Sequence, residues 1–280
     1  MLYPVSMGDA LQDFIGRHTR LFVLTGAGCS TDSGIPDYRD ADGGWKRAQP
    51  VQFRAFMDEQ ATRQRYWARS LVGWRRIARA RPNDAHRALA TLEQQGRVGI
   101  LVTQNVDRLH QAAGSSNVVD LHGRLDLVRC MGCERRIPRE ELQQELLRRN
   151  PGWVDLDARE APDGDADLDG LDFSRFEVPA CAACGGLLKP DVVFYGESVP
   201  RERVVTAMQG VRDADAMLIV GTSLMVYSGY RFAREAASAG IPIASVNLGR
   251  TRADELIALK VTQSCAAALA FLLEESSRVA

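Results

Sequence analysis

Two Cys-x-x-Cys pairs constrain this chain more than any other feature. The first pair is Cys130 and Cys133, the second is Cys181 and Cys184, and 47 residues, positions 134–180, separate the two. Four thiolates in this arrangement supply the tetrahedral shell that one structural zinc ion requires. Because a closed shell leaves no position for water or substrate, we expect the metal to stabilise a small module and the chemistry to lie elsewhere. Four reduced thiols or two disulfides are the alternative interpretation.

The composition is that of an ordinary globular protein. The 280 residues are 45% hydrophobic with a formal net charge of −1, so nothing electrostatic favours nucleic acid or a membrane surface as the main partner. No segment approaches the roughly 18 apolar residues of a membrane span, and residues 1–10 lack the pattern of a signal peptide. Six cysteines, four of them expected on zinc, suit a reducing compartment. We therefore predict a cytoplasmic protein.

A glycine-rich loop follows the first predicted strand. Residues 21–25 are an apolar run typical of a buried parallel strand, and Gly26 and Gly28 follow it directly. Glycines at this point let the backbone approach a pyrophosphate at a helix N-terminus. The third glycine of the dinucleotide-binding pattern is absent, because Thr31 stands there, and a tight turn without a ligand would need the same glycines. The polar loop that continues to Asp40 favours a ligand.

Polar residues also follow the next predicted strand. Gln104, Asn105 and Asp107 come after an apolar run over residues 98–102, and His122 ends the short apolar segment beyond them. An amide pair beside a carboxylate can recognise a carboxamide. A histidine at a strand end can act as a base, although a buried structural histidine is the alternative. Since parallel sheets bind ligands at the carboxyl ends of their strands, we expect these side chains to share one site.

Two later apolar segments complete a strand–helix alternation. This alternation predicts an α/β protein with a Rossmann-like, doubly wound parallel sheet, and a smaller module that contains a zinc ribbon and helices. Ser223 and Asn247 fall where they can bind phosphate or ribose. The two segments are residues 216–220, which lead into Gly221, Thr222 and Ser223, and residues 241–246, which lead into Asn247, Leu248 and Gly249.

The chain divides into three predicted parts. Residues 1–40, 88–123 and 190–280 form a discontinuous Rossmann-like domain that binds the dinucleotide. Residues 41–87 are an inserted helical module, and residues 124–189 are an inserted zinc-binding module. The hydrophobic patterns predict helices over residues 9–17, within 51–95 and over about 266–276.

The motifs together resemble the sirtuin family. The chain contains the following motifs in the order found in the family: GAGCSTDSGIPDYR (26–39), TQNVD (103–107), LHG (121–123), KPDVVFYGE (189–197), GTSL (221–224) and VNLG (246–249). Both cysteine pairs lie between the third motif and the fourth. The stretches RQRYWARSLVGW (63–74) and VYSGYRF (226–232) further resemble class II sirtuins. The resemblance implies an NAD-dependent protein-lysine deacetylase or deacylase. Such an enzyme uses NAD as co-substrate, holds one structural zinc, and releases nicotinamide and O-acyl-ADP-ribose.

The resemblance also implies roles for individual residues. It makes His122 the general base, places Asn105 in the catalytic set, and implies that the segment of Val192, Val193 and Phe194 pairs with the substrate backbone as an added strand. The implied cofactor-binding residues are Gly26, Ala27, Gly28, Ser30, Asp37, Tyr38, Arg39, Gln104, Asn105, Asp107, Gly221, Thr222, Ser223, Asn247, Leu248, Gly249 and Cys265. The sequence departs from the family at Cys29, where many relatives carry Ile or Val, and at Tyr38, where class I members usually have Phe.

Several functional alternatives stay open. The same fold could act as a mono-ADP-ribosyltransferase on proteins, or as a deacylase for unusual groups such as lipoyl or hydroxymethylglutaryl. Tyr66 and Arg69 have the Tyr-x-x-Arg spacing of desuccinylating sirtuins, inside the class II-like stretch. A zinc-ribbon module for protein or nucleic-acid binding on an inert scaffold fits the balanced charge less well. We expect acyl-lysine proteins as partners and a monomeric chain.

Overall fold

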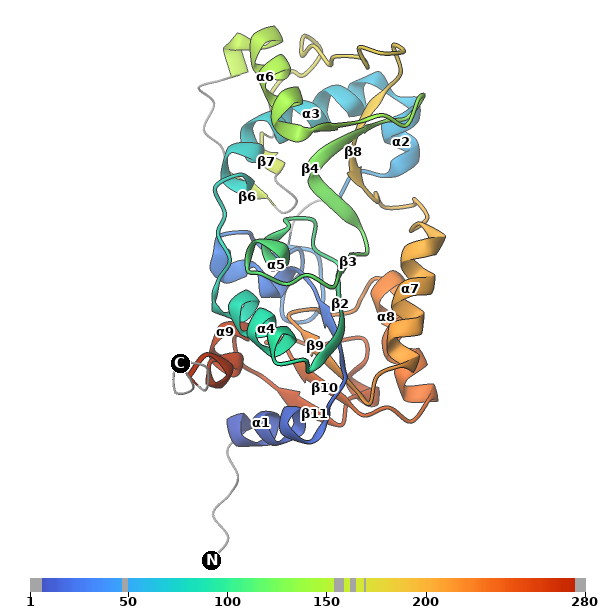
Figure 1. The fold of residues 1–280 in the computed structure, drawn as a ribbon. Helices are drawn as coiled ribbons and strands as arrows, with labels where there is room; N and C mark the ends of the chain where they lie inside the picture. The colour runs from blue at the N-terminus through green and yellow to red at the C-terminus, as the bar shows by residue number, and fades with distance from the viewer. Residues whose placement is uncertain (1–6, 47–49, 154–158, 162–164, 169, 275–280) are drawn as a thin grey trace, which may run out of the picture.

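A six-stranded parallel sheet forms the centre of the larger lobe (Figure 1). The computed structural model describes residues 7–46, 50–153, 159–161, 165–168 and 170–274. The strand order is β11-β10-β9-β1-β2-β3, and every pairing is parallel. This order confirms the predicted doubly wound fold. The strands are β1 (Leu21–Thr25), β2 (Val98–Thr103), β3 (Val118–Asp120), β9 (Ala216–Val220), β10 (Ile243–Val246) and β11 (Leu259–Val261).

Helices cover both faces of this sheet. Strand β1 is buried at every position, because Leu21 and Val23 face one layer of helices while Phe22 and Leu24 face the other. This explains why the strand is a continuous apolar run rather than an alternating one. The first layer contains α1 (Met7–Arg17), α4 (Asp84–Gln94) and α9 (Cys265–Leu269); the second contains α7 (Arg201–Arg212) and α8 (Tyr227–Ser238), with the short α5 (Leu109–Ala112) beyond β2.

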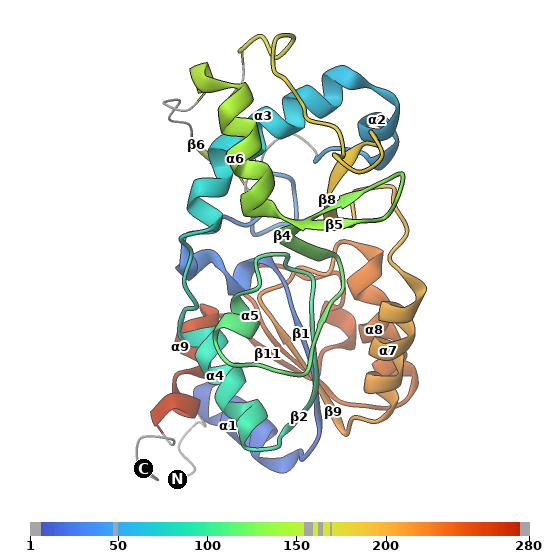
Figure 2. The same cartoon turned by 45° about the horizontal axis from the view of Figure 1, so that its top comes forward.

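The smaller lobe combines an antiparallel sheet with helices (Figure 2). Its sheet has the order β5-β4-β8, and a separate hairpin pairs β6 with β7. Arg139 lies buried in its core, with the guanidinium 5.0 Å from the centre of the Trp74 ring and 5.5 Å from that of Trp67. The elements are α2 (Phe53–Asp58), α3 (Gln60–Ile77), β4 (Gly123–Cys130), β5 (Arg136–Pro138), α6 (Arg139–Arg149), β6 (Arg159–Ala161), β7 (Asp165–Asp167) and β8 (Leu188–Val192).

One hydrophobic core joins the two predicted insertions. Phe56 and Trp67, from residues 41–87, pack in the same cluster as Leu125 and Leu146, from residues 124–189. The helices of residues 41–87 and the zinc-binding module of residues 124–189 therefore form one lobe. The sheet of this lobe extends to Val192, so β8 runs past the predicted boundary at residue 190. The three-part division of the chain stays a prediction.

Three local expectations differ from the structure. The backbone after β1 forms two short 3-10 turns, Ala27–Cys29 and Thr31–Ser33, where the glycine pattern indicated the N-terminus of a helix. Strand β10 begins at Ile243 and not at residue 241, since Pro242 has no N–H to donate to a ladder. Helix α9 ends at Leu269 and the chain turns at Ala270, but residues 271–274 are helical again; the last two residues of the predicted helix, 275 and 276, lie outside the described part.

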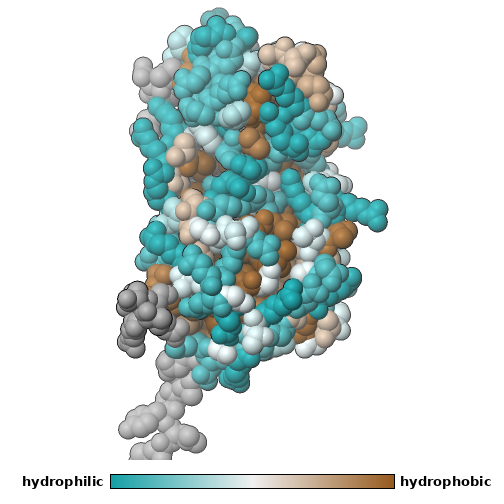
Figure 3. All heavy atoms as spheres, viewed as in Figure 1, coloured by the Kyte–Doolittle hydropathy of each residue, from teal (hydrophilic) through white to brown (hydrophobic). Residues whose placement is uncertain are grey.

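The surface is mostly hydrophilic on the face drawn in Figure 3, where hydrophobic residues gather in small groups around the middle of the molecule. Within the described residues, no helix combines the length and hydrophobicity that crossing a bilayer requires. Leu248 is 67% exposed, and it is one of the residues that line the cavity at the end of the sheet. A large apolar side chain in that place offers a flat contact for a ligand.

Candidate functional site

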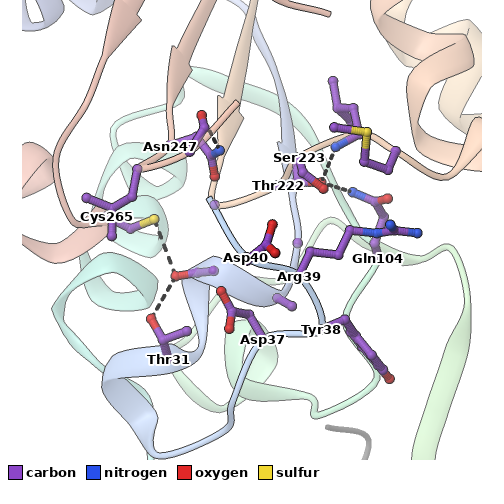
Figure 4. Close-up of a pocket in the computed structure, with 18 of the residues that line it drawn as sticks. Thr31, Asp37, Tyr38, Arg39, Asp40, Gln104, Thr222, Ser223, Asn247 and Cys265 are labelled. Atoms are coloured by element: carbon purple, nitrogen blue, oxygen red, sulfur yellow. Dashed lines mark hydrogen bonds between the residues drawn. The ribbon is translucent and has the colours of Figure 1, made fainter. Parts of the chain in front are cut away.

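A cavity of about 360 Å³ opens at the carboxyl ends of β1 and β9, where the strand order reverses (Figure 4). This is the switch point at which doubly wound sheets bind ligands. All of the implied cofactor-binding residues line it apart from Ser30 and Asp107. They are Gly26, Ala27, Gly28, Asp37, Tyr38, Arg39, Gln104, Asn105, Gly221, Thr222, Ser223, Asn247, Leu248, Gly249 and Cys265.

Glycines bring the loops after β1 and β9 into direct contact. The N–H of Gly28 donates to the carbonyl of Gly221 at 2.8 Å. Gly221 has a φ of +62°, and a Cβ added there would lie 2.3 Å from the nitrogen of Cys29. A side chain cannot fit in that space. The glycines therefore allow the two loops to pack backbone against backbone, in addition to letting the backbone approach a pyrophosphate.

Ser30 and Asp107 lie behind the cavity wall and hold Asn105. The Ser30 hydroxyl donates to Oδ2 of Asp107 at 2.7 Å and accepts from Nδ2 of Asn105 at 3.0 Å. The same Asn105 amide reaches the carbonyl of Gly26, also at 3.0 Å. Burial raises the pKa of Asp107, while hydrogen bonds from the Leu109 N–H and from Ser30 oppose that rise. This network fixes the orientation of the Asn105 side chain in the cavity.

The loop over residues 37–46 forms another wall of the cavity. The Arg39 guanidinium lies 3.8 Å from the centre of the Trp45 ring and donates to the carbonyl of Gly43 at 2.7 Å. Lys46 and Asp37 form an ion pair. These contacts order the charged loop that we expect, from its sequence, to cover a ligand.

Several residues that line the first cavity were not predicted from the sequence. Thr31, Asp32 and Asp40 stand in the polar loop, so its composition was a signal for them. Gln263 and Ser264 follow β11, a strand that the sequence analysis did not predict. Beside them, burial raises the pKa of the Cys265 thiol to about 12, so this thiol stays neutral. The other unpredicted residues are Ala41, Lys46, Tyr195, Leu224, Met225, Val226 and Arg250.

His122 lies where the first cavity meets a second one. The second cavity, of about 490 Å³, runs along Val192, Val193 and Phe194. His122 and Tyr38 line both cavities, and Gln104, Tyr195 and Val226 do so too. A group bound in one cavity can therefore meet a group bound in the other beside the imidazole of His122.

Two hydrogen bonds fix the His122 ring. Its Nδ1 lies 3.1 Å from the carbonyl oxygen of Gln104, and its Nε2 lies 2.7 Å from the Ser228 hydroxyl. A carbonyl only accepts, so Nδ1 carries the proton and Nε2 is left as the basic nitrogen. Burial lowers the pKa of His122 to about 4; the bond to Gln104 opposes this, and the positive charges of Arg203 and Arg231 lower it further. The imidazole is therefore neutral near pH 7.

A buried ion pair holds the segment that borders the second cavity. Lys189 Nζ lies 3.0 Å from Oε2 of Glu197, and its side chain is only 4% exposed. The same Glu197 oxygen accepts from the N–H of Phe194 at 2.9 Å, and the Val193 N–H donates to the carbonyl of His122 at 2.8 Å. Burial lowers the pKa of Lys189, against the effect of Glu197. The pair thus connects β8 to the turn that follows it.

Tyr66 and Arg69 line neither cavity. The Tyr66 ring is 8% exposed and packs edge-on against Phe56 and Trp67 in the core of the smaller lobe. The Tyr-x-x-Arg spacing therefore reflects packing at Tyr66. It gives no geometric support for succinyl or glutaryl recognition.

The four cysteines of the two pairs come together in the smaller lobe. Their sulfurs lie within 4.8 Å of one another, with Cys130 and Cys184 at 3.4 Å and Cys133 and Cys181 at 3.8 Å. The N–H of Cys133 lowers the pKa of Cys130 to about 6, and Gly132 adds to the effect. A Cβ at Gly186 would lie 2.9 Å from the Cys130 sulfur. Thiolate-stabilising N–H groups and space kept around the sulfurs fit a structural zinc ion.

The fold and the cavities define a protein with a Rossmann-like sheet, a cavity at the carboxyl ends of its strands, and a second lobe in which four cysteines come together. A model of the Sir2 family matches residues 26–228. A protein of Xanthomonas campestris pv. campestris (strain 8004), named NAD-dependent protein deacetylase, is 70% identical over 265 residues, 95% of this chain and 90% of that protein. NAD-dependent protein deacetylase 2 of Bradyrhizobium diazoefficiens is 69% identical over 265 residues, 95% of this chain and 97% of its own.

Solved structures agree with these relatives. A complex described as Sir2-p53 peptide-NAD+ aligns with a TM-score of 0.78 at 29% identity, covering 96% of this chain and 98% of that one. Another, described as Sir2 bound to acetylated peptide, aligns with a TM-score of 0.76 at 30% identity and the same coverage. The chain belongs to the Sir2 family.

Proposed function

We propose that this chain is an NAD-dependent protein-lysine deacetylase that releases nicotinamide and O-acetyl-ADP-ribose. The position of His122, with a basic Nε2 at the junction of two cavities, is the observation that carries the proposal. Relatives at 70% and 69% identity carry the name NAD-dependent protein deacetylase, which supports the same activity here. NAD serves as a co-substrate that is consumed, and an acetylated lysine on a protein is the second substrate.

Each cavity takes one substrate in this proposal. NAD occupies the cavity under the loop after β1, with its nicotinamide end toward Gln104 and Asn105, whose amides can recognise a carboxamide. The acetyl-lysine enters the second cavity, and the substrate backbone pairs with Val193 and its neighbours as an added strand. The acetyl oxygen displaces nicotinamide from the ribose, and a ribose hydroxyl then attacks the acetyl carbon. One water is consumed as the bond from that carbon to the lysine nitrogen breaks, which leaves a free lysine and carries the acetyl group away on ADP-ribose.

His122 takes up the proton of a ribose hydroxyl. A general base must be neutral at the working pH and must expose a lone pair to the group that it deprotonates. Burial keeps the His122 ring neutral by lowering its pKa to about 4, and the hydrogen bond from Nδ1 to the Gln104 carbonyl leaves the lone pair on Nε2. Asn105 acts beside it, held in place by Ser30 and Asp107.

The remaining assignments are proposed together. We place the protein in the cytoplasm as a monomer, acting on proteins and not on nucleic acid or membranes; the near-zero net charge and the free cysteines support this. Membership of class II and activity on acyl groups longer than acetyl follow from the sequence stretches 63–74 and 226–232.

Mass spectrometry of the reaction tests the proposal. An acetyl-lysine peptide incubated with NAD should lose one acetyl group, while O-acetyl-ADP-ribose appears in equal amount. A parallel panel of lipoyl, hydroxymethylglutaryl and succinyl peptides measures the acyl preference. If every peptide stays intact and an acceptor protein gains ADP-ribose, the protein is a mono-ADP-ribosyltransferase. If NAD is not consumed in either assay, the proposal is wrong.

A further inference from the structure

We propose that Cys29, His86 and His110 form a second metal site, which binds Zn²⁺ in the larger lobe behind the cofactor cavity. The site is separate from the four-cysteine cluster, and it does not depend on the proposed deacetylase activity. The three ligands come from different elements: Cys29 from the 3-10 turn after β1, His86 from the first turn of α4, and His110 from α5.

The three side chains are buried and close together. One ligand atom from each lies within 4.8 Å of the other two. Cys29 is 1% exposed, His86 is 0% and His110 is 1%, and the two imidazole centres are 4.7 Å apart. A thiol and two imidazoles are a donor set that Zn²⁺ binds well.

Each imidazole already has a partner for one of its nitrogens. His86 Nδ1 lies 3.0 Å from Oδ1 of Asn83, to which it donates when it carries the proton. In the other tautomer, the same nitrogen accepts a hydrogen bond from the Asn83 backbone nitrogen, 3.3 Å away. His110 Nε2 lies 2.8 Å from the Thr25 hydroxyl. Metal-bound histidines are oriented by a hydrogen bond of this kind on the nitrogen that does not bind the metal.

The other two nitrogens are poorly satisfied. His110 Nδ1 is buried and has no hydrogen-bond partner within the described parts of the chain. His86 Nε2 has only a long contact of 3.4 Å, to the hydroxyl of Ser30. A buried polar atom without a partner is uncommon and costs free energy. A zinc ion coordinated by both nitrogens and by the Cys29 sulfur would remove this cost, with Ser30 or a water as the fourth ligand.

Binding has a defined proton balance and a structural consequence. Zn²⁺ replaces the proton of the Cys29 thiol, so one proton passes to solvent for each ion bound, and no redox change occurs. Cys29 lies between Gly28, which lines the cofactor cavity, and Ser30, which holds Asn105. A bound ion would therefore tie the cofactor loop to α4 and α5.

Metal counting tests the site on the 280-residue chain. Protein that holds only its structural zinc is dialysed to equilibrium against increasing Zn²⁺, and bound metal is counted by mass spectrometry. In parallel, Co²⁺ is added and the near-ultraviolet band of a thiolate–cobalt bond is recorded. Cys29→Val removes the sulfur and keeps an apolar side chain of similar size, and His110→Gln removes one imidazole. Cys265→Ser is the matched control, because it alters a buried thiol outside the cluster.

The wild type and Cys265→Ser should each bind a second zinc ion and show the cobalt band. Cys29→Val and His110→Gln should bind the second ion at least tenfold more weakly, and Cys29→Val should lack the band. Binding of a single zinc ion by the wild type, with no cobalt band, would overturn the proposal whatever the variants do. An unchanged second ion in a folded Cys29→Val would also overturn it.

Discussion

The Ser228 hydroxyl lies 2.7 Å from Nε2 of His122 and is the hydrogen-bond partner of this basic nitrogen. Ser228 comes from the first turn of α8, 106 positions from the histidine in the chain. Because Nδ1 holds the proton, the serine donates and the nitrogen accepts. Ser228 thus stabilises the neutral tautomer of His122.

Replacing Ser228 should alter the acid limb of the pH profile. In Ser228→Ala the hydrogen bond to the neutral imidazole is lost, so we expect the pKa of His122 to rise and kcat/KM to fall about tenfold, equivalent to about 1.4 kcal/mol. Steady-state kinetics from about pH 3.5 to about 8, with short exposure to acid, measures both effects. Ser228→Thr keeps the hydroxyl and should behave like the wild type. An unchanged profile in Ser228→Ala would show that the contact has no role in setting the base.

The wild-type enzyme should keep its activity well below neutral pH. The base works when deprotonated, so kcat/KM rises as pH increases through the pKa of His122 in the free enzyme. Burial and the nearby Arg203 and Arg231 lower that pKa to about 4, so the acid limb should lie near pH 4 to 5. Kinetics with short exposure to acid, checked by recovery at pH 7, separates titration from unfolding. An acid limb centred near 6.5 would contradict the buried environment of this ring.

Breaking the Lys189–Glu197 pair should destabilise the protein and weaken peptide binding. Glu197→Gln leaves a buried ammonium group without its counter-charge, at a cost of about 3 kcal/mol in the free energy of unfolding. Urea denaturation measures this loss, and the KM for the acetylated peptide should rise because the Phe194 N–H then bonds a neutral amide oxygen in place of a carboxylate. The double variant Lys189→Met/Glu197→Gln removes both charges and should recover most of the stability. A single variant as stable as the wild type would mean that the pair is not needed.

Loss of the structural zinc should unfold the smaller lobe first. Cys130→Ser removes one of four ligands, and we expect the variant to lack the ion and to melt about 10 °C lower, equivalent to about 3 kcal/mol for a domain of this size. Zinc analysis and calorimetry give the two quantities. Cys265→Ser serves as control, since it leaves the cluster intact. A soluble Cys130→Ser protein with full zinc content and an unchanged melting temperature would refute the structural role of the metal.

Buried apolar runs made the larger lobe predictable. Strands β1 and β9 are buried on both sides, so their sequences are continuous hydrophobic segments with clear ends. Strand β11 was not predicted because it has only three residues and includes Lys260. The loop after Gly26 followed a helix-start pattern, yet contact with the loop after β9 holds it in 3-10 turns.

The site was predictable in its residue types and less so in its arrangement. The motifs identified His122 and the wall of the first cavity, because these residues follow strands and face one edge of the sheet. Ser228 carried no signal, since its contact with the histidine depends on how α8 packs. The sequence also did not show that Ser30 and Asp107 support Asn105 from behind the cavity wall, which only the folded hydrogen-bond network establishes.

The rate of NAD-dependent deacetylation in His122→Ala shows whether His122 is the general base of the reaction. Acetyl-lysine peptide and NAD are given to the wild type and to the variant, and nicotinamide and O-acetyl-ADP-ribose are quantified by mass spectrometry. NAD binding measured by calorimetry shows whether the variant keeps its cofactor cavity. We expect His122→Ala to retain NAD binding and its kcat to be lower by about 10²- to 10⁴-fold, the range for a lost general base. A variant that deacetylates at the wild-type rate would contradict it.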